Sequence, residues 1–208
     1  MSRQTPRPVS VLAWRAAWIS LISVLSVTVV MALAIAYQGE AGRSALTLDR
    51  FDERWQIQSG AATPDRLVLH PAADAIGVAL RPIDPQPDGF SLKTRVTFDQ
   101  ATGAAGLIVQ ADDADHFVAF LVSADGYFRV SDYRNGVWID QVPWTTWPHI
   151  RRDGSPNLLR AECRREMCTF FVNDEWTWQA ETIPATTQIG VTAANAEVMF
   201  DQFALRSP

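Results

Sequence analysis

Cysteine is scarce in this sequence, whose 208 residues include two, Cys163 and Cys168. Two cysteines with no histidine near them cannot supply the four ligands of a tetrahedral zinc site. Their spacing differs from Cys-x-x-Cys, which makes a redox-active pair the weaker interpretation. Because no cysteine stands directly after the apolar segment near the N-terminus, a lipid-anchored lipoprotein is excluded.

Basic clusters, internal repeats and low-complexity tracts are absent as well. The formal net charge is -5, and 20% of the residues are charged while 48% are hydrophobic. This composition is typical of a globular protein. Nucleic-acid binding requires a clustered basic surface, so we expect no nucleic-acid partner.

Charge is missing altogether from residues 16–39. A helix needs about 20 mostly apolar residues to cross a bilayer, and Trp18 and Tyr37 lie near the ends of the run, as interfacial aromatics do. Three arginines and no acidic residue precede it, which by the positive-inside rule puts the N-terminus in the cytoplasm. The sequence therefore predicts a single-pass protein of the cell membrane: cytoplasmic residues 1–15, a transmembrane helix 16–37, a linker 38–48 and an extracytoplasmic domain 49–208.

A cleaved signal peptide is the alternative for this segment, with Ala34-Ile35-Ala36 as a small-residue cleavage site. The apolar part of a signal peptide usually spans about 7–15 residues, so the length favours a retained anchor. Small residues recur along the span at Ser20, Ser23 and Ser26. Serines are tolerated in a single span, but such a stripe can also pack against a partner helix.

Helical periodicity is absent after residue 40, where short strand-like segments follow one another between turn signals. FSLKTRVTF, residues 90–98, alternates between apolar and polar positions, and HFVAFLVS, residues 116–123, is a nearly continuous apolar run typical of a buried strand. Asp125-Gly126 and Asn135-Gly136 are strong turn signals. Roughly a dozen short strands predict an all-β sandwich of two antiparallel sheets.

The two cysteines fall on a predicted hairpin, NLLRAECRREMCTFFVNDEW, residues 157–176. Strand alternation puts Cys163 and Cys168 on either side of a loop formed by residues 164–167. Residues that flank such a loop lie opposite each other at a distance suitable for a disulfide, which persists outside the cytoplasm. We therefore predict a Cys163–Cys168 bridge.

The order of these motifs resembles that of the concanavalin A-like lectin/glucanase jelly-roll superfamily, over about residues 49–206. The similar stretches are LDRFDERWQIQSG at the start, GLIVQADDADHFVAFLVSADGYFRVSDYRNGVW in the centre, the cysteine hairpin, and IGVTA and VMFDQFAL at the end. The resemblance is closest to the bacterial laminin-G-like and keto-disaccharide-hydrolase-like branch. It implies a jelly-roll architecture and says little about activity. Asp174 stands where the family's late hairpin has glycine.

Catalytic motifs are not found. Jelly-roll glucanases of this superfamily carry Glu-x-Asp-x-Glu on one strand, which is absent here. Glu197 and Asp201 are the nearest equivalent and are expected to be structural. The sequence also lacks a Gly-x-Ser-x-Gly elbow, and its three histidines are scattered at positions 70, 116 and 149. We therefore expect a non-enzymatic protein without a cofactor.

Tryptophan is abundant, with eight residues. Trp55 and Trp138 are expected in the core, and Trp144 and Trp147 in a proline-flanked loop. Aromatic faces on loops or on a concave sheet can stack on sugar rings. The candidates for sugar stacking are Trp144, Trp147, Trp176, Trp178 and Tyr133. Core packing is the alternative for each.

Three carboxylates in the predicted turn 112–115 are weak calcium candidates: Asp112, Asp113 and Asp115. A solvated turn is the preferred explanation, because the other ligands of a calcium site are not visible. We expect no metal to be required.

These features predict a membrane-anchored, extracytoplasmic recognition module that binds a glycan or cell-envelope polymer. An accessory subunit of a larger membrane complex, docked through its anchor helix, is the second hypothesis. A glycoside hydrolase-like enzyme is the third.

Overall fold

The computed structural model describes residues 50–83, 89–165, 167–181 and 187–206. The predicted cytoplasmic segment, transmembrane helix, serine stripe and linker lie outside these residues. Within the described ranges, no helix has the length and apolar character needed to cross a bilayer, and fourteen β-strands form the regular structure. The prediction of an all-β domain is confirmed.

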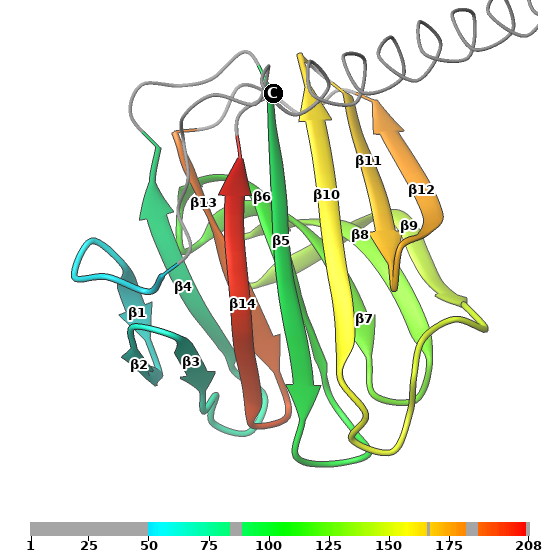
Figure 1. The fold of residues 1–208 in the computed structure, drawn as a ribbon, viewed down its shortest axis with the longest axis horizontal. Helices are drawn as coiled ribbons and strands as arrows, with labels where there is room; N and C mark the ends of the chain where they lie inside the picture. Colours follow the sequence, from blue (N-terminus) through cyan, green and yellow to red (C-terminus); the bar gives the residue numbers. More distant parts are fainter. Residues whose placement is uncertain (1–49, 84–88, 166, 182–186, 207–208) are drawn as a thin grey trace, which may run out of the picture. The chain divides into compact units, whose positions relative to one another are not determined.

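The strands form two seven-stranded sheets (Figure 1). Sheet 1 has the spatial order β1 (Gln56–Gln58), β4 (Ile76–Pro82), β13 (Gln188–Ala194), β6 (Ala104–Asp113), β7 (His116–Ser123), β8 (Tyr127–Arg134) and β9 (Val137–Thr146). Sheet 2 has the order β12 (Glu175–Glu181), β11 (Met167–Val172), β10 (Asn157–Arg164), β5 (Gly89–Phe98), β14 (Val198–Arg206), β3 (Arg66–Leu69) and β2 (Gly60–Thr63). Each neighbouring pair is antiparallel.

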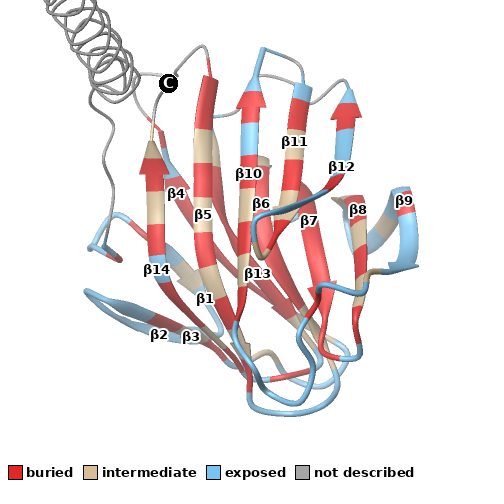
Figure 2. Ribbon diagram, turned by 45° about the vertical axis from the view of Figure 1, so that its right-hand side comes forward, coloured by how far each residue is buried: buried red, intermediate tan, exposed pale blue. Residues whose placement is uncertain are grey.

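The main core lies between the sheets, where alternate residues of each strand point inward. In β5 the predicted alternation holds, because Phe90, Leu92, Val96 and Phe98 are all buried. Phe120 of β7 and Phe170 of β11 connect the two sheets, with stacked rings whose centroids are 4.8 Å apart. Figure 2 shows β7 buried along most of its length, whereas β9 and β12 at the sheet edges are largely exposed.

A second apolar cluster lies on the outer face of sheet 1, the face turned away from sheet 2. Its buried members alternate with residues of the main core, and Ile108, for example, lies between Leu107 and Val109. The cluster consists of Val78, Leu80, Ile108, Ala111, Phe117, Ala119 and Leu121. Both faces of the central strands are therefore buried, which explains why β6 and β7 are nearly continuous apolar runs.

The cysteine hairpin forms as predicted, with a disulfide between Cys163 and Cys168. The two residues are direct cross-strand partners of β10 and β11, and their Cα atoms are 4.0 Å apart. The tip is tighter than the predicted loop, because Arg164 and Met167 also pair. Strand pairing therefore continues one residue beyond the disulfide on each side.

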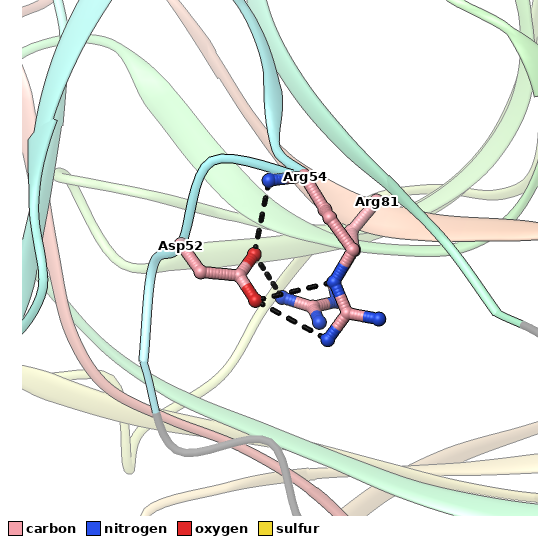
Figure 3. Close-up of polar contacts among 3 residues, drawn as sticks. All are labelled: Asp52, Arg54 and Arg81. Carbon is pink, nitrogen blue, oxygen red and sulfur yellow. Dashed lines mark hydrogen bonds and ion pairs between the residues drawn. The ribbon is translucent and has the colours of Figure 1, made fainter.

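The first described segment is fastened to sheet 1 by a buried arginine (Figure 3). Arg81 near the end of β4 has 1% of its side chain exposed, and its Nη1 donates to Asp52 Oδ1 at 2.5 Å. Arg54 also donates to Asp52, through its backbone amide at 3.1 Å and through its guanidinium. Next to this contact, Phe51 and Trp55 pack against each other in the main core.

Candidate ligand-binding site

The β8–β9 hairpin builds the candidate site, and its turn follows from the sequence. Asn135 and Gly136 both have positive φ, 49° and 86°, as the two central residues of a type I′ turn require. β9 has ten residues against eight in β8, and its register with β8 shifts twice. These irregularities are β-bulges, which change the direction of side chains on an edge strand.

The first bulge brings Trp144 to Arg129. Phe128 pairs with Thr145 and Val130 with Val142, so Arg129 lies across from Pro143 and Trp144. The sequence prediction of a loop at Trp144 is wrong, since the residue belongs to β9. Proline is tolerated there because β9 is an edge strand and needs no donor on its outer side.

Arg129 is the centre of a cluster on the outer face of sheet 1. Its guanidinium carbon lies 4.7 Å from the ring centroid of Trp138 and 5.4 Å from that of Trp144. Arg129 Nε donates to Ser131 Oγ at 2.5 Å and lies 2.9 Å from Asp140 Oδ1. Ser131 Oγ donates to the same carboxylate at 2.5 Å. We call these five residues the Arg129 cluster.

The electrostatics of the cluster are nearly balanced. Burial lowers the pKa of Arg129, and the charge of Asp140 opposes that change. The arginine side chain is 12% exposed and the aspartate side chain 36% exposed. The cation is thus neutralised by a carboxylate and covered by rings, which makes it a poor direct partner for a charged ligand.

Next to the cluster lies an open hollow of ≈ 500 Å³. Trp144 contributes to both, and Tyr127 and Ser123 continue the wall onto β8 and β7. The full lining is Thr102, Gly103, Ala104, Ser123, Asp125, Tyr127, Trp144 and Asn195. Hydroxyl, amide and carboxylate groups therefore lie around the indole of Trp144, a residue that is 38% exposed. Such a combination suits a ligand with an apolar face and several hydroxyl groups.

One of the other sugar-stacking candidates, Tyr133, packs close to the site. Tyr133 stacks on Phe117 with centroids 5.0 Å apart and contacts Trp138 at 4.8 Å. Trp138 was expected in the core, but it is only partly buried and packs on the outer apolar cluster. The expectation for Trp55 is confirmed, because that residue is 6% exposed in the main core.

The remaining tryptophan candidates do not line the hollow. Trp147 packs against the main core and makes an edge contact with Phe128 at 6.0 Å. Trp176 and Trp178 belong to β12, at the edge of sheet 2, and are 52% and 40% exposed. The structure therefore separates the predicted aromatic set between the two sheets.

The predicted acidic and histidine positions have local structural partners. Asp201 forms a bidentate ion pair with Arg95 at 2.6 and 2.7 Å, and Glu197 contacts His70 at 2.7 Å. His116 lies 3.1 Å from a carboxylate oxygen of Asp113. His149 lies beside Trp147, with ring centroids 5.7 Å apart.

Of the calcium candidates, Asp112 and Asp113 end β6, and Asp113 caps the turn that follows. The backbone amide of Asp115 donates to Asp113 Oδ1 at 2.8 Å. That hydrogen bond is the largest effect on the pKa of Asp113 and lowers it. Desolvation raises the pKa by a smaller amount, His116 lowers it further, and the pKa lies below its ordinary value. Across the described ranges, no group of three or more His, Cys, Asp or Glu side chains is arranged to hold a metal ion.

Sequence reasoning missed the polar part of the site. Ser131 and Asp140 are direct partners in the regular register that begins at the Asn135–Gly136 turn, and Arg129 lies on the same face of β8 as Ser131. The contact of Arg129 with Trp144 depends in addition on a bulge, and bulges leave no clear pattern in one sequence. The turn signals at Gly126 and Gly136 did indicate that β8 is bounded by tight turns. They did not show which side chains would meet across it.

Comparison with known proteins identifies the fold. No family model matches the sequence, and no curated protein matches it. Among solved structures, the carbohydrate-binding module CBM66 of Bacillus subtilis has a TM-score of 0.59 at 15% identity, over 74% of this chain and 96% of that one.

Two other solved structures give the same result. The GH43 protein BlXynB of Bacillus licheniformis has a TM-score of 0.58 at 16% identity, over 77% of this chain and 38% of that one. A putative glycosyl hydrolase of Parabacteroides distasonis has a TM-score of 0.57 at 12% identity, over 79% of this chain and 100% of that one. The described domain therefore shares the fold of these structures, a β-sandwich of two antiparallel sheets.

Proposed function

We propose that the domain is a non-catalytic module that binds a glycan at the hollow beside Trp144. The observation that carries this proposal is the exposed indole of Trp144 at the rim of a hollow lined by hydroxyl, amide and carboxylate groups. A sugar ring presents an apolar C–H face to an aromatic ring and hydroxyls to polar neighbours. The name of the similar Bacillus subtilis module, a carbohydrate-binding module, supports the same class of ligand.

The absence of catalysis is part of the proposal. Glycoside hydrolysis uses two carboxyl groups that flank the scissile bond, and the lining of the hollow contains one, Asp125. Asp140 is close to Trp144 through Arg129, but its carboxylate is engaged by Arg129 and Ser131. The hollow is therefore better suited to hold a sugar than to cleave one.

Replacement of Trp144 with alanine tests the site. We expect the affinity for the best ligand found on a glycan array to fall by about 30-fold, since removing a central aromatic anchor typically costs about 2 kcal/mol or more. Isothermal titration calorimetry measures the effect. Trp176→Ala is the matched control, because Trp176 is also exposed but lies on sheet 2. If that control loses binding and Trp144→Ala does not, the ligand site is on β12 instead.

We also propose that residues 16–37 retain the domain at the outer side of a membrane. The uncharged run of that segment supports this, as does the disulfide, because disulfides persist in oxidising compartments. The full chain is expected to remain in the pellet when membranes are washed with alkaline carbonate. Release into the supernatant would contradict the anchor and favour a cleaved signal peptide.

A further inference from the structure

We propose that Arg129 is a positioning residue, which fixes the ring of Trp144 at the rim of the hollow without touching the ligand itself. The inference deepens the proposed function and rests on it for its effect on glycan affinity. Its structural part, the fixing of the ring, can be measured whether or not a ligand is known.

The restraint on Trp144 comes from the side chain of Arg129. The residue lies on an edge strand at a bulge, directly after Pro143, where regular strand pairing is interrupted. Its neighbours on the outer face include Arg129, whose guanidinium carbon is 5.4 Å from the indole centroid. A cation over an aromatic face attracts the ring, so the position of the guanidinium decides where the indole rests.

Arg129 can serve this purpose because it is itself held in place. Trp138 lies 4.7 Å from the guanidinium, while Ser131 and Asp140 bind its Nε. Trp138 packs in turn against Tyr133 and Phe117, with centroids 4.8 and 5.7 Å away. A chain of contacts thus leads from the outer apolar cluster through Trp138 and Arg129 to Trp144.

In this arrangement Arg129 orients the indole, and Trp144 contacts the ligand. The cation faces rings and a carboxylate and does not line the hollow. Trp144 presents its ring to the ligand in one orientation before binding, so less conformational entropy is lost when the complex forms.

Substitution of Arg129 with glutamine in the full chain tests both parts. The chain is labelled with 5-fluorotryptophan, which gives one ¹⁹F signal for each of its eight tryptophans, and Trp144→Phe and Trp138→Phe identify two of them. Arg129→Gln is expected to move these two signals and leave the other six in place. A misfolded domain would instead move the signals of all six tryptophans that follow residue 49.

Affinity for the array-selected glycan provides the second readout. Loss of one partly buried cation–π contact should weaken binding by about tenfold, and Arg129→Lys, which keeps the charge, should recover part of the loss. Arg160→Gln is the matched control, because Arg160 lies 3.8 Å over the ring of Phe171 on sheet 2. It should leave the affinity and the Trp144 signal unchanged.

The outcomes separate the inference from the function. An unchanged Trp144 signal in Arg129→Gln overturns the inference. A moved signal with unchanged affinity overturns the role of Arg129 in binding while the site itself stands. A wild-type chain that binds no glycan defeats the proposed function, and the ¹⁹F signals still decide whether Arg129 fixes the ring.

Discussion

Replacing Asp52 with alanine is expected to lower the free energy of unfolding by about 3 kcal/mol, because it leaves the buried guanidinium of Arg81 without its anion. Arg81 has 1% of its side chain exposed and contacts Asp52 at 2.5 Å. A buried charge that loses its partner keeps the full cost of desolvation. Urea unfolding followed by tryptophan fluorescence measures the change.

The control for this prediction is Arg54→Ala. Arg54 binds the same carboxylate, but its side chain is 69% exposed, so its loss should cost less than about 1 kcal/mol. Equal effects of the two substitutions would show that burial of Arg81 contributes little to the stability of the domain.

The ion pair between Asp52 and Arg81 also makes the stability of the domain depend on pH. Partial burial raises the pKa of Asp52, but hydrogen bonds from Arg81 and the Arg54 amide outweigh that effect and hold the pKa below its ordinary value. A carboxylate whose pKa is lower in the folded state stabilises the protein above its unfolded pKa of about 3.9. This stabilisation should disappear as the pH falls from about 4 through the folded pKa, and Asp52→Ala should lack that part of the acid transition.

Replacing Gly106 with alanine is the second substitution with a large expected effect, a loss of about 3 kcal/mol. A Cβ atom at Gly106 would fall 1.9 Å from the carbonyl oxygen of Phe120 and 2.8 Å from the Cα of Leu121. Both are backbone atoms of the neighbouring strand β7, which cannot move aside without breaking its own pairing. The central strands β6 and β7 would have to separate locally.

Gly77→Ala provides the comparison within the same sheet. Its Cβ would meet Leu69 and Pro71 side-chain atoms at 3.4 and 3.6 Å, which are ordinary contacts. That substitution should be neutral or stabilising by up to about 1 kcal/mol, because alanine restricts the unfolded chain more than glycine does. Thermal unfolding of the two variants compares their stabilities. A Gly106→Ala variant more stable than Gly77→Ala would contradict the prediction.

Much of the fold follows from patterns that depend on neighbouring residues. The alternation in β5 and the apolar run of β7 were readable because a two-residue period decides which face of a strand is buried. The disulfide was predictable for the same reason, since Cys163 and Cys168 share a face on either side of a tight turn.

The site was less accessible to such reasoning. Pro143 indicates the end of a strand when the sequence is considered alone, yet β9 continues to Thr146 because an edge strand tolerates proline. The meeting of Arg129 with Trp144 depends on where a bulge occurs, and the burial of Arg81 depends on a partner 29 residues away in the chain. Neither is set by local pattern.

The two strands nearest the C-terminus lie inside the sheets. β13 is inserted between β4 and β6, and β14 between β5 and β3. During synthesis, β4, β5 and β6 leave the ribosome well before these central partners exist. Both sheets must therefore wait for residues 188–206 before they can close, and apolar strand edges stay open to a chaperone or to aggregation until translation of that segment is complete.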